Sequence, residues 1–243
     1  ALTVTSPPYN IGKEYEEPRP VNDYLDWCEV WIREVHRLTQ RNGAFWFNLG
    51  YVSLKGRAKA IPIPYLLWER VPFYLVQEVV WHYGAGVAAK RSFSPRNEKF
   101  LWYVKDANQY TFNLDDVRDP NVKYPNQKKN GKVKCNPLGK NPSDVWHIPK
   151  VTSGTNRSSK ERTPHPAQFP TAVVDRIVKA CSNPGDLVFD PFVGSGSLVE
   201  AAGRNDRLAV GIEINPAYVR IAADRICRFV RRRKQEEAQQ ALF

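Results

Sequence analysis

A proline-rich corner near the start of the chain combines groups that can hold a planar amine. The motif Ser6-Pro7-Pro8-Tyr9 follows Ala1–Thr5, a short run that favours a strand. Proline cannot continue a central strand, and two prolines in a row fix the backbone. Ser6 adds a hydroxyl, the Pro7 carbonyl adds an acceptor, and Tyr9 adds a flat ring. Such a stiff pocket fits an extruded nucleic-acid base that carries an exocyclic amine.

A second motif joins a strand to a helix through a turn of small residues. Leu187–Asp190 is a strand-like run, and Phe192 precedes a turn that contains Gly194 and Gly196. Doubly wound folds bind nucleotides at such turns, because glycine lets the backbone approach a ligand. No G-x-G-x-x-G pattern is present, and the Asp190 carboxylate would repel a pyrophosphate. An ordinary turn is the alternative, but an acid here suits a cationic ligand with an amine and a sulfonium.

Alternating strand-like and helix-like segments surround both motifs. We expect helices at Val21–Gln40, Ile63–Val71, Pro170–Cys181, Ser197–Asn205 and Ala217–Arg233, and strands at Ala1–Thr5, Ala44–Leu49, Tyr74–Trp81, Lys99–Val104, Leu187–Asp190 and Leu208–Ile212. This alternation predicts an α/β fold with a mostly parallel sheet covered on both faces. Glu213 ends the last strand, where a carboxylate can bind both hydroxyls of a ribose. Residues 105–163 lack periodicity and are expected to form an insertion of loops and short strands.

The composition excludes several classes of protein. With 243 residues, of which 42% are hydrophobic and 25% charged, the chain is globular rather than disordered. The sequence has no run long enough for a membrane span, no visible signal peptide and four scattered cysteines, which favours a reduced, cytoplasmic setting. Four histidines without ligand spacing indicate no metal site. The chain has no methionine and starts in a strand-like run, so we expect upstream sequence.

Positive charge is concentrated in one segment. The formal net charge is +11, and residues 121–163 hold ten Lys or Arg against two Asp or Glu. A long basic segment without helical periodicity is typical of a nucleic-acid binder, although a solvated surface is the alternative. For Arg231–Lys234, at a helix end, the solvated surface is favoured. The candidates for phosphate contacts are Lys128, Lys129, Lys132, Lys134 and Arg157.

The two motifs and their order resemble the amino DNA methyltransferases of the circularly permuted beta class. In that family the catalytic motif comes first and the cofactor motif later, as Thr5–Asn10 and Asp190–Gly196 do here. His165–Pro170 resembles the family's cofactor-flanking motif, and residues 91–105 resemble the strand region before its variable recognition segment. The acid that the family usually carries upstream of the catalytic strand is missing, which agrees with a chain that begins late.

The resemblance implies a Rossmann-like fold that depends on S-adenosyl-L-methionine. Residues 1–105 would form the catalytic half, 106–163 an inserted target-recognition segment for double-stranded DNA, and 164–243 the cofactor half. The implied contacts to the cofactor are Asp190, Phe192, Gly194 and Gly196 at its amino acid part, Glu213 at its ribose, and Phe169, Pro170 and Ile214 near its adenine. Phe169 fits the core equally well.

The implied reaction is methyl transfer to the exocyclic amine of a flipped base. Ser6 Oγ and the Pro7 carbonyl would accept its N–H groups, Pro8 would stiffen the corner, and Tyr9 would stack on the base. Methylation of a cytosine ring carbon requires a cysteine nucleophile, which usually follows a proline, and the chain has no Pro-Cys pair. In the family, Ser at this position usually accompanies cytosine N4 methylation and Asp usually accompanies adenine N6 methylation. We therefore expect cytosine N4 as the target, with adenine N6 as the alternative.

The sequence leaves other functions open. An RNA or protein amino-methyltransferase is less well supported, because Ser6 replaces the Asn of such sites. An inactive DNA-binding subunit would not need the intact Tyr9, Asp190 and Glu213. By analogy with the family, a cognate restriction endonuclease is an expected partner. A homodimer could form through exposed segments such as Lys55–Pro64.

Overall fold

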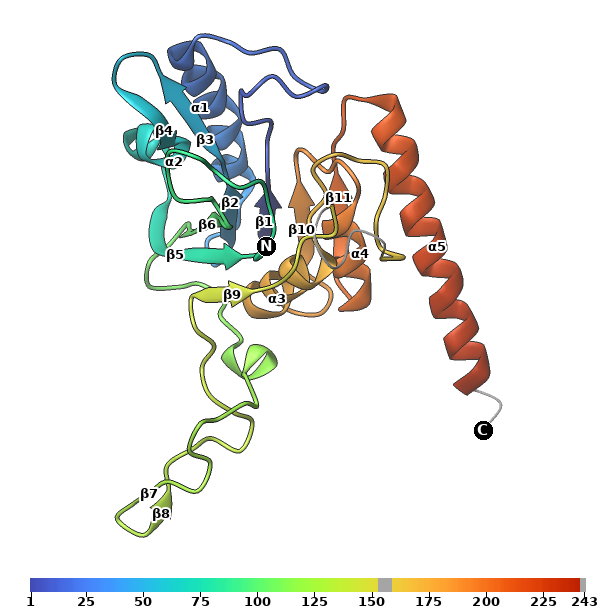
Figure 1. Ribbon diagram of the computed structural model, residues 1–243. Coiled ribbons are helices and arrows are strands. Elements are labelled where there is room, and N and C mark those ends of the chain that lie inside the picture. The colour runs from blue at the N-terminus through green and yellow to red at the C-terminus, as the bar shows by residue number, and fades with distance from the viewer. Residues whose placement is uncertain (153–158, 241–243) are drawn as a thin grey trace.

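A seven-stranded sheet forms the centre of the computed structural model, which describes residues 1–152 and 159–240 (Figure 1). Its strands in spatial order are β11 (Leu208–Gly211), β10 (Leu187–Asp190), β1 (Leu2–Thr5), β2 (Ala44–Asn48), β6 (Asn97–Val104), β5 (Tyr74–His82) and β9 (Val145–His147). Neighbours pair in parallel except where β6 meets β2 and β5, so β6 alone among these seven runs the other way. The expectation of a mostly parallel sheet is confirmed.

The central strands are buried on both faces of the sheet. Every residue of β1 and β2 is buried. Successive side chains of a strand point to opposite faces. Phe45 and Phe47 therefore join one apolar cluster, while Ala44 and Trp46 join the other. This two-sided burial explains why the runs read as continuously apolar rather than alternating.

Helices supply the other half of each cluster. The buried stripe of α1 (Val21–Leu38) consists of Tyr24, Leu25, Cys28, Ile32 and Val35. This stripe packs on the face that carries Phe45 and Phe47. Helices α3 (Thr171–Cys181) and α4 (Ser197–Arg204) pack on the opposite face. Helix α5 (Pro216–Gln240) lies against α4 and extends past it at one side of the molecule (Figure 1).

The expected helix at Ile63–Val71 is broken into two short pieces. Helix α2 spans Ile63–Leu66 and the 3-10 turn η1 spans Trp68–Arg70. The Leu67 N–H is shared between the carbonyls of Ile63 and Pro64, so the helix tightens after one turn. A hairpin that we did not expect, β3 (Tyr51–Leu54) with β4 (Ala58–Pro62), precedes these pieces.

The segment before α3 contains loops and short elements, as expected. They are η2 (Leu114–Val117), β7 (Lys128–Lys129) and β8 (Lys132–Val133), followed by β9 on the main sheet. The β7–β8 hairpin projects from the molecule at the end opposite to the carboxyl ends of β1, β10 and β11 (Figure 1). Within the described residues, no helix combines the length and apolar character needed to cross a membrane.

Candidate active site

Parallel pairing of β1 and β10 brings the two sequence motifs together. Leu2 pairs with Val188 and Thr3 with Phe189, so the strands end side by side. The Thr5 hydroxyl donates a hydrogen bond of 2.6 Å to Asp190 Oδ1, across 185 positions of sequence. The proline motif and the glycine turn therefore begin at neighbouring points on one edge of the sheet.

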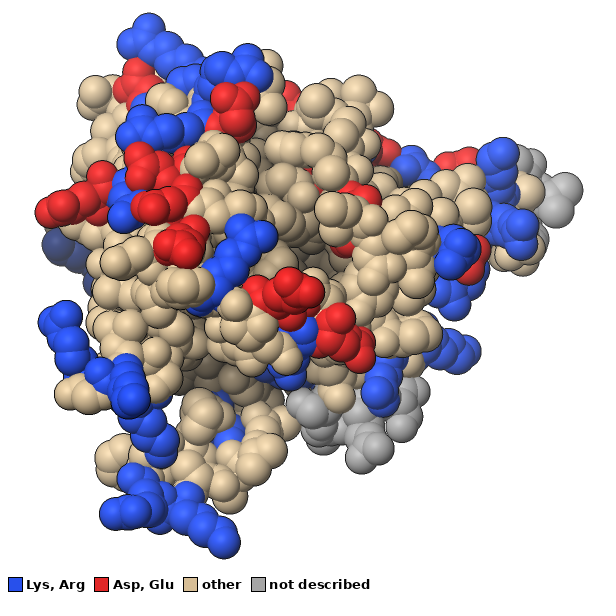
Figure 2. All heavy atoms as spheres, turned by 90° about the horizontal axis from the view of Figure 1, so that it is seen from above, with Lys and Arg blue, Asp and Glu red and all other residues tan. Residues whose placement is uncertain are grey.

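One cavity of about 830 Å³ lies between the two motifs. Ten of the residues singled out from the sequence line it: Ser6, Pro7, Pro8, Tyr9, Phe169, Asp190, Phe192, Gly194, Glu213 and Ile214. Figure 2 looks onto this end of the molecule and shows a hollow near its centre, bordered by acidic and basic side chains. The cavity is large enough to hold more than one small ligand group, as a two-substrate transfer requires.

A network of neutral polar groups holds the proline corner. The Ser6 hydroxyl donates to the Tyr9 hydroxyl at 2.8 Å, and the Tyr9 hydroxyl in turn donates to Asn48 Oδ1. Asn48 is fully buried, and its Nδ2 donates to the Lys99 carbonyl at 2.9 Å. Since the Ser6 proton points to Tyr9, the lone pairs of Ser6 Oγ stay available as acceptors. The sequence interpretation missed Asn48, although a polar residue that ends an aromatic strand was a usable signal.

The Tyr9 ring packs directly on the backbone of Gly50, where a side chain would occupy the same space. A Cβ on Gly50 would lie 2.5 Å from Tyr9 Cδ2. Burial, followed by the charge of Glu98, raises the pKa of Tyr9 well above its usual value, so Tyr9 keeps its proton. The Tyr24 hydroxyl of α1 donates to the Pro8 carbonyl at 2.6 Å. The corner is therefore fixed from the sheet and from α1.

Two carboxylates line the other side of the cavity. Burial raises the pKa of Asp190 to about 7, the hydrogen bonds from Thr5 and the Phe192 N–H oppose the shift, and the charge of Glu213 adds to it. Glu213 accepts from the Gly194 N–H at 3.0 Å and from the Asn215 N–H at 2.9 Å. Neither carboxylate has an ion pair among the described residues. A cationic ligand would supply the missing charge.

The two glycines of the turn are required for different reasons. Gly194 has φ of 49°, and a Cβ there would lie 2.9 Å from His165 Nε2, so it forms the cavity wall beneath that ring. Gly196 has φ of 78°, and its Cβ would lie 3.2 Å from the Cβ of Ala222 in α5. Gly196 therefore packs against α5 and does not line the cavity. Pro170 does not line the cavity either, because it is buried directly before α3.

Aromatic side chains complete the walls. Phe192 contacts Trp31 and Trp27 of α1, with ring centroids 5.2 and 5.6 Å away. Phe169 lines the cavity and also packs on Phe100 and Trp81, so its place in the core is confirmed while its contact with a cofactor stays a prediction. Ile214 is 95% exposed at the rim.

A second aromatic group lies beside the glycine turn, and two of its members, Tyr15 and His165, line the cavity. Tyr15 stacks on His165 at 6.2 Å, and Tyr218 meets the same ring at 4.4 Å. Burial lowers the pKa of His165, which favours the neutral form of the ring. The sequence interpretation used His165 only as part of a motif and missed both tyrosines.

The remaining candidates lie away from the cavity. Lys128, Lys129, Lys132 and Lys134 are exposed on or beside the β7–β8 hairpin. Arg157 lies outside the described residues. No group of three or more described His, Cys, Asp or Glu side chains is arranged to hold a metal ion.

The sequence of the chain is similar to those of known DNA methyltransferases. Residues 1–224 match the N6/N4 methyltransferase family model, described as DNA methylase. The type II methyltransferase M.ScaI of Streptomyces caespitosus is 64% identical over 225 residues, which cover 93% of this chain and 74% of that protein. The DNA adenine methyltransferase YhdJ of Escherichia coli is 32% identical, over 93% of this chain and 75% of that protein.

A solved structure shares the fold. The PvuII DNA methyltransferase, which is cytosine-N4-specific, superposes with a TM-score of 0.71 over 93% of this chain and 78% of that one. Sequence identity in that match is 21%, so it bears on the fold alone. The expected methyltransferase fold is confirmed.

Proposed function

Because the chain belongs to the N6/N4 DNA methylase family, which depends on S-adenosyl-L-methionine, we propose that it methylates the exocyclic N4 amine of cytosine in double-stranded DNA. The observation that carries the proposal is the shared cavity, in which the Thr5–Asp190 hydrogen bond joins the amine-holding corner to the carboxylate side. The base would reach this cavity by flipping out of the duplex.

The carboxylate side has the donors and acceptors that the cofactor requires. S-adenosyl-L-methionine carries the methyl group on a sulfonium, and its amino acid part adds an ammonium. We propose that Asp190 faces this positive end, that Glu213 binds the ribose, and that the Gly194 backbone lies against the amino acid part. Phe192 and the exposed Ile214 would pack on the apolar surfaces of the cofactor.

The proline corner is suited to activate a weak nucleophile. An exocyclic amine shares its lone pair with the ring, so it must be turned toward tetrahedral geometry before it attacks. In the proposal, Ser6 Oγ and the Pro7 carbonyl accept its two N–H groups, Tyr9 stacks on the base, and Asn48 holds both hydroxyls. Alignment of two reactants can lower the activation free energy by roughly 7–11 kcal/mol. Hydrogen-bond acceptors aimed at the positive charge that develops on nitrogen lower this activation free energy further.

We also propose that residues 106–163 bind the DNA, with phosphate contacts from Lys128, Lys129, Lys132 and Lys134. The β7–β8 hairpin projects away from the cavity end (Figure 1). For these lysines to contact DNA bound at the cavity, the duplex would have to extend past that end, or the hairpin of a second copy would have to reach it. A cognate restriction endonuclease is the proposed functional partner, since relatives such as M.ScaI are type II methyltransferases.

Mass spectrometry of nucleosides tests the choice of base. DNA from cells that express the protein is digested and compared with DNA from cells that express Ser6→Ala. The proposal predicts N4-methylcytosine in the first sample and much less of it in the second. Adenine N6 is the second candidate, because the relative YhdJ is named for adenine. If N6-methyladenine alone appears, the target is adenine, and if duplex DNA is inert while RNA is methylated, the proposed substrate class is wrong.

A further inference from the structure

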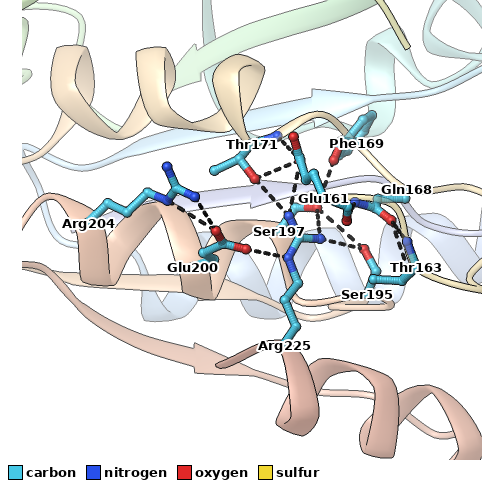
Figure 3. A network of polar contacts seen from close by, with 10 residues as sticks. All are labelled: Glu161, Thr163, Gln168, Phe169, Thr171, Ser195, Ser197, Glu200, Arg204 and Arg225. Carbon is cyan, nitrogen blue, oxygen red and sulfur yellow. Dashed lines mark hydrogen bonds and ion pairs between the residues drawn. The ribbon is translucent and has the colours of Figure 1, made fainter. Parts of the chain in front are cut away.

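A buried arginine of α5 makes polar contacts with residues of three segments (Figure 3). Arg225 is 4% exposed. Its guanidinium donates to Glu200 and Ser197 of α4 at 2.5 and 2.9 Å, to Ser195 in the glycine turn at 3.4 Å, and to Thr171 at the start of α3 at 2.7 Å. It also forms an ion pair of 3.1 Å with Glu161. One side chain therefore bridges α4, the glycine turn and the segment that leads into α3.

The segment that Arg225 holds includes part of the cavity wall. Glu161 Oε1 accepts from the N–H and the hydroxyl of Thr171, at 2.5 and 2.7 Å, and so caps α3. Gln168 Nε2 donates to the Glu161 carbonyl at 2.8 Å, while Gln168 Oε1 accepts from the Thr163 N–H and hydroxyl. His165 and Phe169, which line the cavity, lie within this braced loop.

The same guanidinium also holds the glycine turn against that loop. The Ser197 hydroxyl accepts from Arg225 and donates to the Phe169 carbonyl at 2.8 Å. Gly194, three residues earlier, needs a left-handed backbone. Small shifts of Ser197 would therefore move the cavity wall at Gly194 relative to His165.

We propose that Arg225 is a positioning residue for the cofactor, because it sets the spacing between the glycine turn and the 161–169 loop. The inference rests on the proposed placement of S-adenosyl-L-methionine against the glycine turn. Arg225 itself does not line the cavity, so it acts through Ser197, Glu161 and Thr171.

The electrostatics of the cluster favour positioning over plain stabilisation. Burial opposes ionisation of Glu200, but hydrogen bonds from Arg225 and Arg204 outweigh it and hold the pKa of Glu200 below its usual value. Two arginines and two glutamates make the cluster neutral. Buried ion pairs of this kind add little net stability compared with apolar packing. We therefore infer that the cluster serves to fix the geometry of the segments that it joins. The planar fork of the Arg225 guanidinium reaches all five of its partners, whereas the ammonium of lysine could not.

The matched test compares two arginine-to-lysine variants. Arg207 is also partly buried and donates three hydrogen bonds, to the carbonyl and hydroxyl of Ser182 and to the Asn205 carbonyl, away from the cavity. Calorimetry with S-adenosyl-L-methionine should show a Kd raised about tenfold or more by Arg225→Lys and changed less than twofold by Arg207→Lys. Thermal melting of both variants reports the loss of fold stability separately. The KM for S-adenosyl-L-methionine should follow the Kd, while kcat at saturating cofactor stays within about threefold.

Two further variants separate the possible failures. Thr171→Val removes a hydroxyl that accepts from Arg225 and does not line the cavity, and it removes no charge. A Kd raised about threefold by this variant would support the inference even if Arg225→Lys folds poorly. Glu213→Gln tests the placement of the cofactor itself. If Glu213→Gln weakens binding and neither Arg225→Lys nor Thr171→Val does, the positioning role is wrong. If Glu213→Gln also has no effect, the placement of the cofactor is wrong.

Discussion

The Thr5 hydroxyl donates directly to the Asp190 carboxylate, so the strand that precedes the proline motif is bonded to the residue that opens the glycine turn. Both side chains are buried, and the bond spans the junction between neighbouring parallel strands. This hydrogen bond fixes the distance between the place where an amine would be held and the place where a cation would bind.

Removal of this hydrogen bond should weaken the binding of the cofactor at the carboxylate side of the cavity. Thr5→Val keeps the shape of a β-branched strand residue but takes a hydrogen bond from a buried acid. We expect a loss of about 1–2 kcal/mol in the free energy of unfolding and a weaker affinity for S-adenosyl-L-methionine, measured by urea denaturation and calorimetry. Thr3→Val on the same strand is the control for stability. Equal affinity losses in both variants would assign the effect to the strand rather than to the hydrogen bond.

Cofactor binding should depend on pH through Asp190. Its pKa in the folded protein is raised to about 7 from 3.8. Because the folded state holds this proton more tightly than the unfolded chain, the associated stability is present below about pH 4 and is lost as the pH rises to about 7. A bound cation favours the ionised form. We therefore expect the affinity for S-adenosyl-L-methionine to rise roughly tenfold between about pH 6 and about pH 7.5.

The control for this pH dependence is Asp190→Asn. This variant should bind the cofactor weakly, with a flat profile over the same range in calorimetry. A wild-type profile that stays flat, or an unchanged profile in the variant, would contradict the assignment of Asp190 to the positive end of the cofactor.

Ser6→Ala should separate catalysis from cofactor binding. Loss of one acceptor aimed at the reacting amine should lower kcat roughly a hundredfold, by the magnitude typical of one preorganised hydrogen bond. The Kd for S-adenosyl-L-methionine should change less than about twofold, because Ser6 lies on the other side of the cavity. Labelled-methyl transfer and calorimetry measure the two quantities. Parallel losses in both would reject the role given to Ser6.

Asn48 should act through the two hydroxyls that it holds. Asn48→Ala leaves Tyr9 without its acceptor, so we expect a fall in kcat of about tenfold with unchanged cofactor affinity. Asn113→Ala is the matched control, since Asn113 also donates its amide to buried backbone carbonyls but lies near the end of α3. If the two variants lose kcat equally, Asn48 serves stability alone.

The β7–β8 hairpin should contribute to DNA affinity through salt-dependent contacts. Replacement of Lys128, Lys129, Lys132 and Lys134 by Ala should reduce the slope of log affinity against log salt by about 0.9 for each phosphate that a lysine no longer neutralises. Fluorescence anisotropy with duplex DNA at several salt concentrations measures the slope. The control removes Arg231 and Arg232, which lie on the exposed part of α5. An unchanged slope in the hairpin variant would remove this segment from the DNA interface.

Local sequence signals were sufficient for the elements that carry the two motifs. Strand runs such as Ala44–Leu49 are apolar because both faces of the sheet are covered, and Pro7 and Gly194 mark the places where the chain must leave a strand. The alternation of elements then allowed a mostly parallel sheet to be expected. The hydrogen bond between Thr5 and Asp190 could not be read from either motif, because it depends on register.

The residues that sequence reasoning missed are those whose role comes from a distant partner. Arg225 lies in a basic helix and looks like a solvated charge, yet three segments bury it. Glu161 follows a segment without periodicity, so nothing local indicated that it caps α3. Asn48 and Gly50 did carry a signal, since a polar residue and a glycine directly after buried aromatics indicate a close approach of other groups.

A crystal structure with S-adenosyl-L-methionine bound would be the most decisive test of the proposed arrangement. We predict that the ammonium and sulfonium lie beside Asp190, the ribose hydroxyls on Glu213, and the methyl carbon directed across the cavity at Ser6 and Tyr9. A methyl carbon directed away from that corner, or separated from it by a protein wall, would overturn the proposed mechanism.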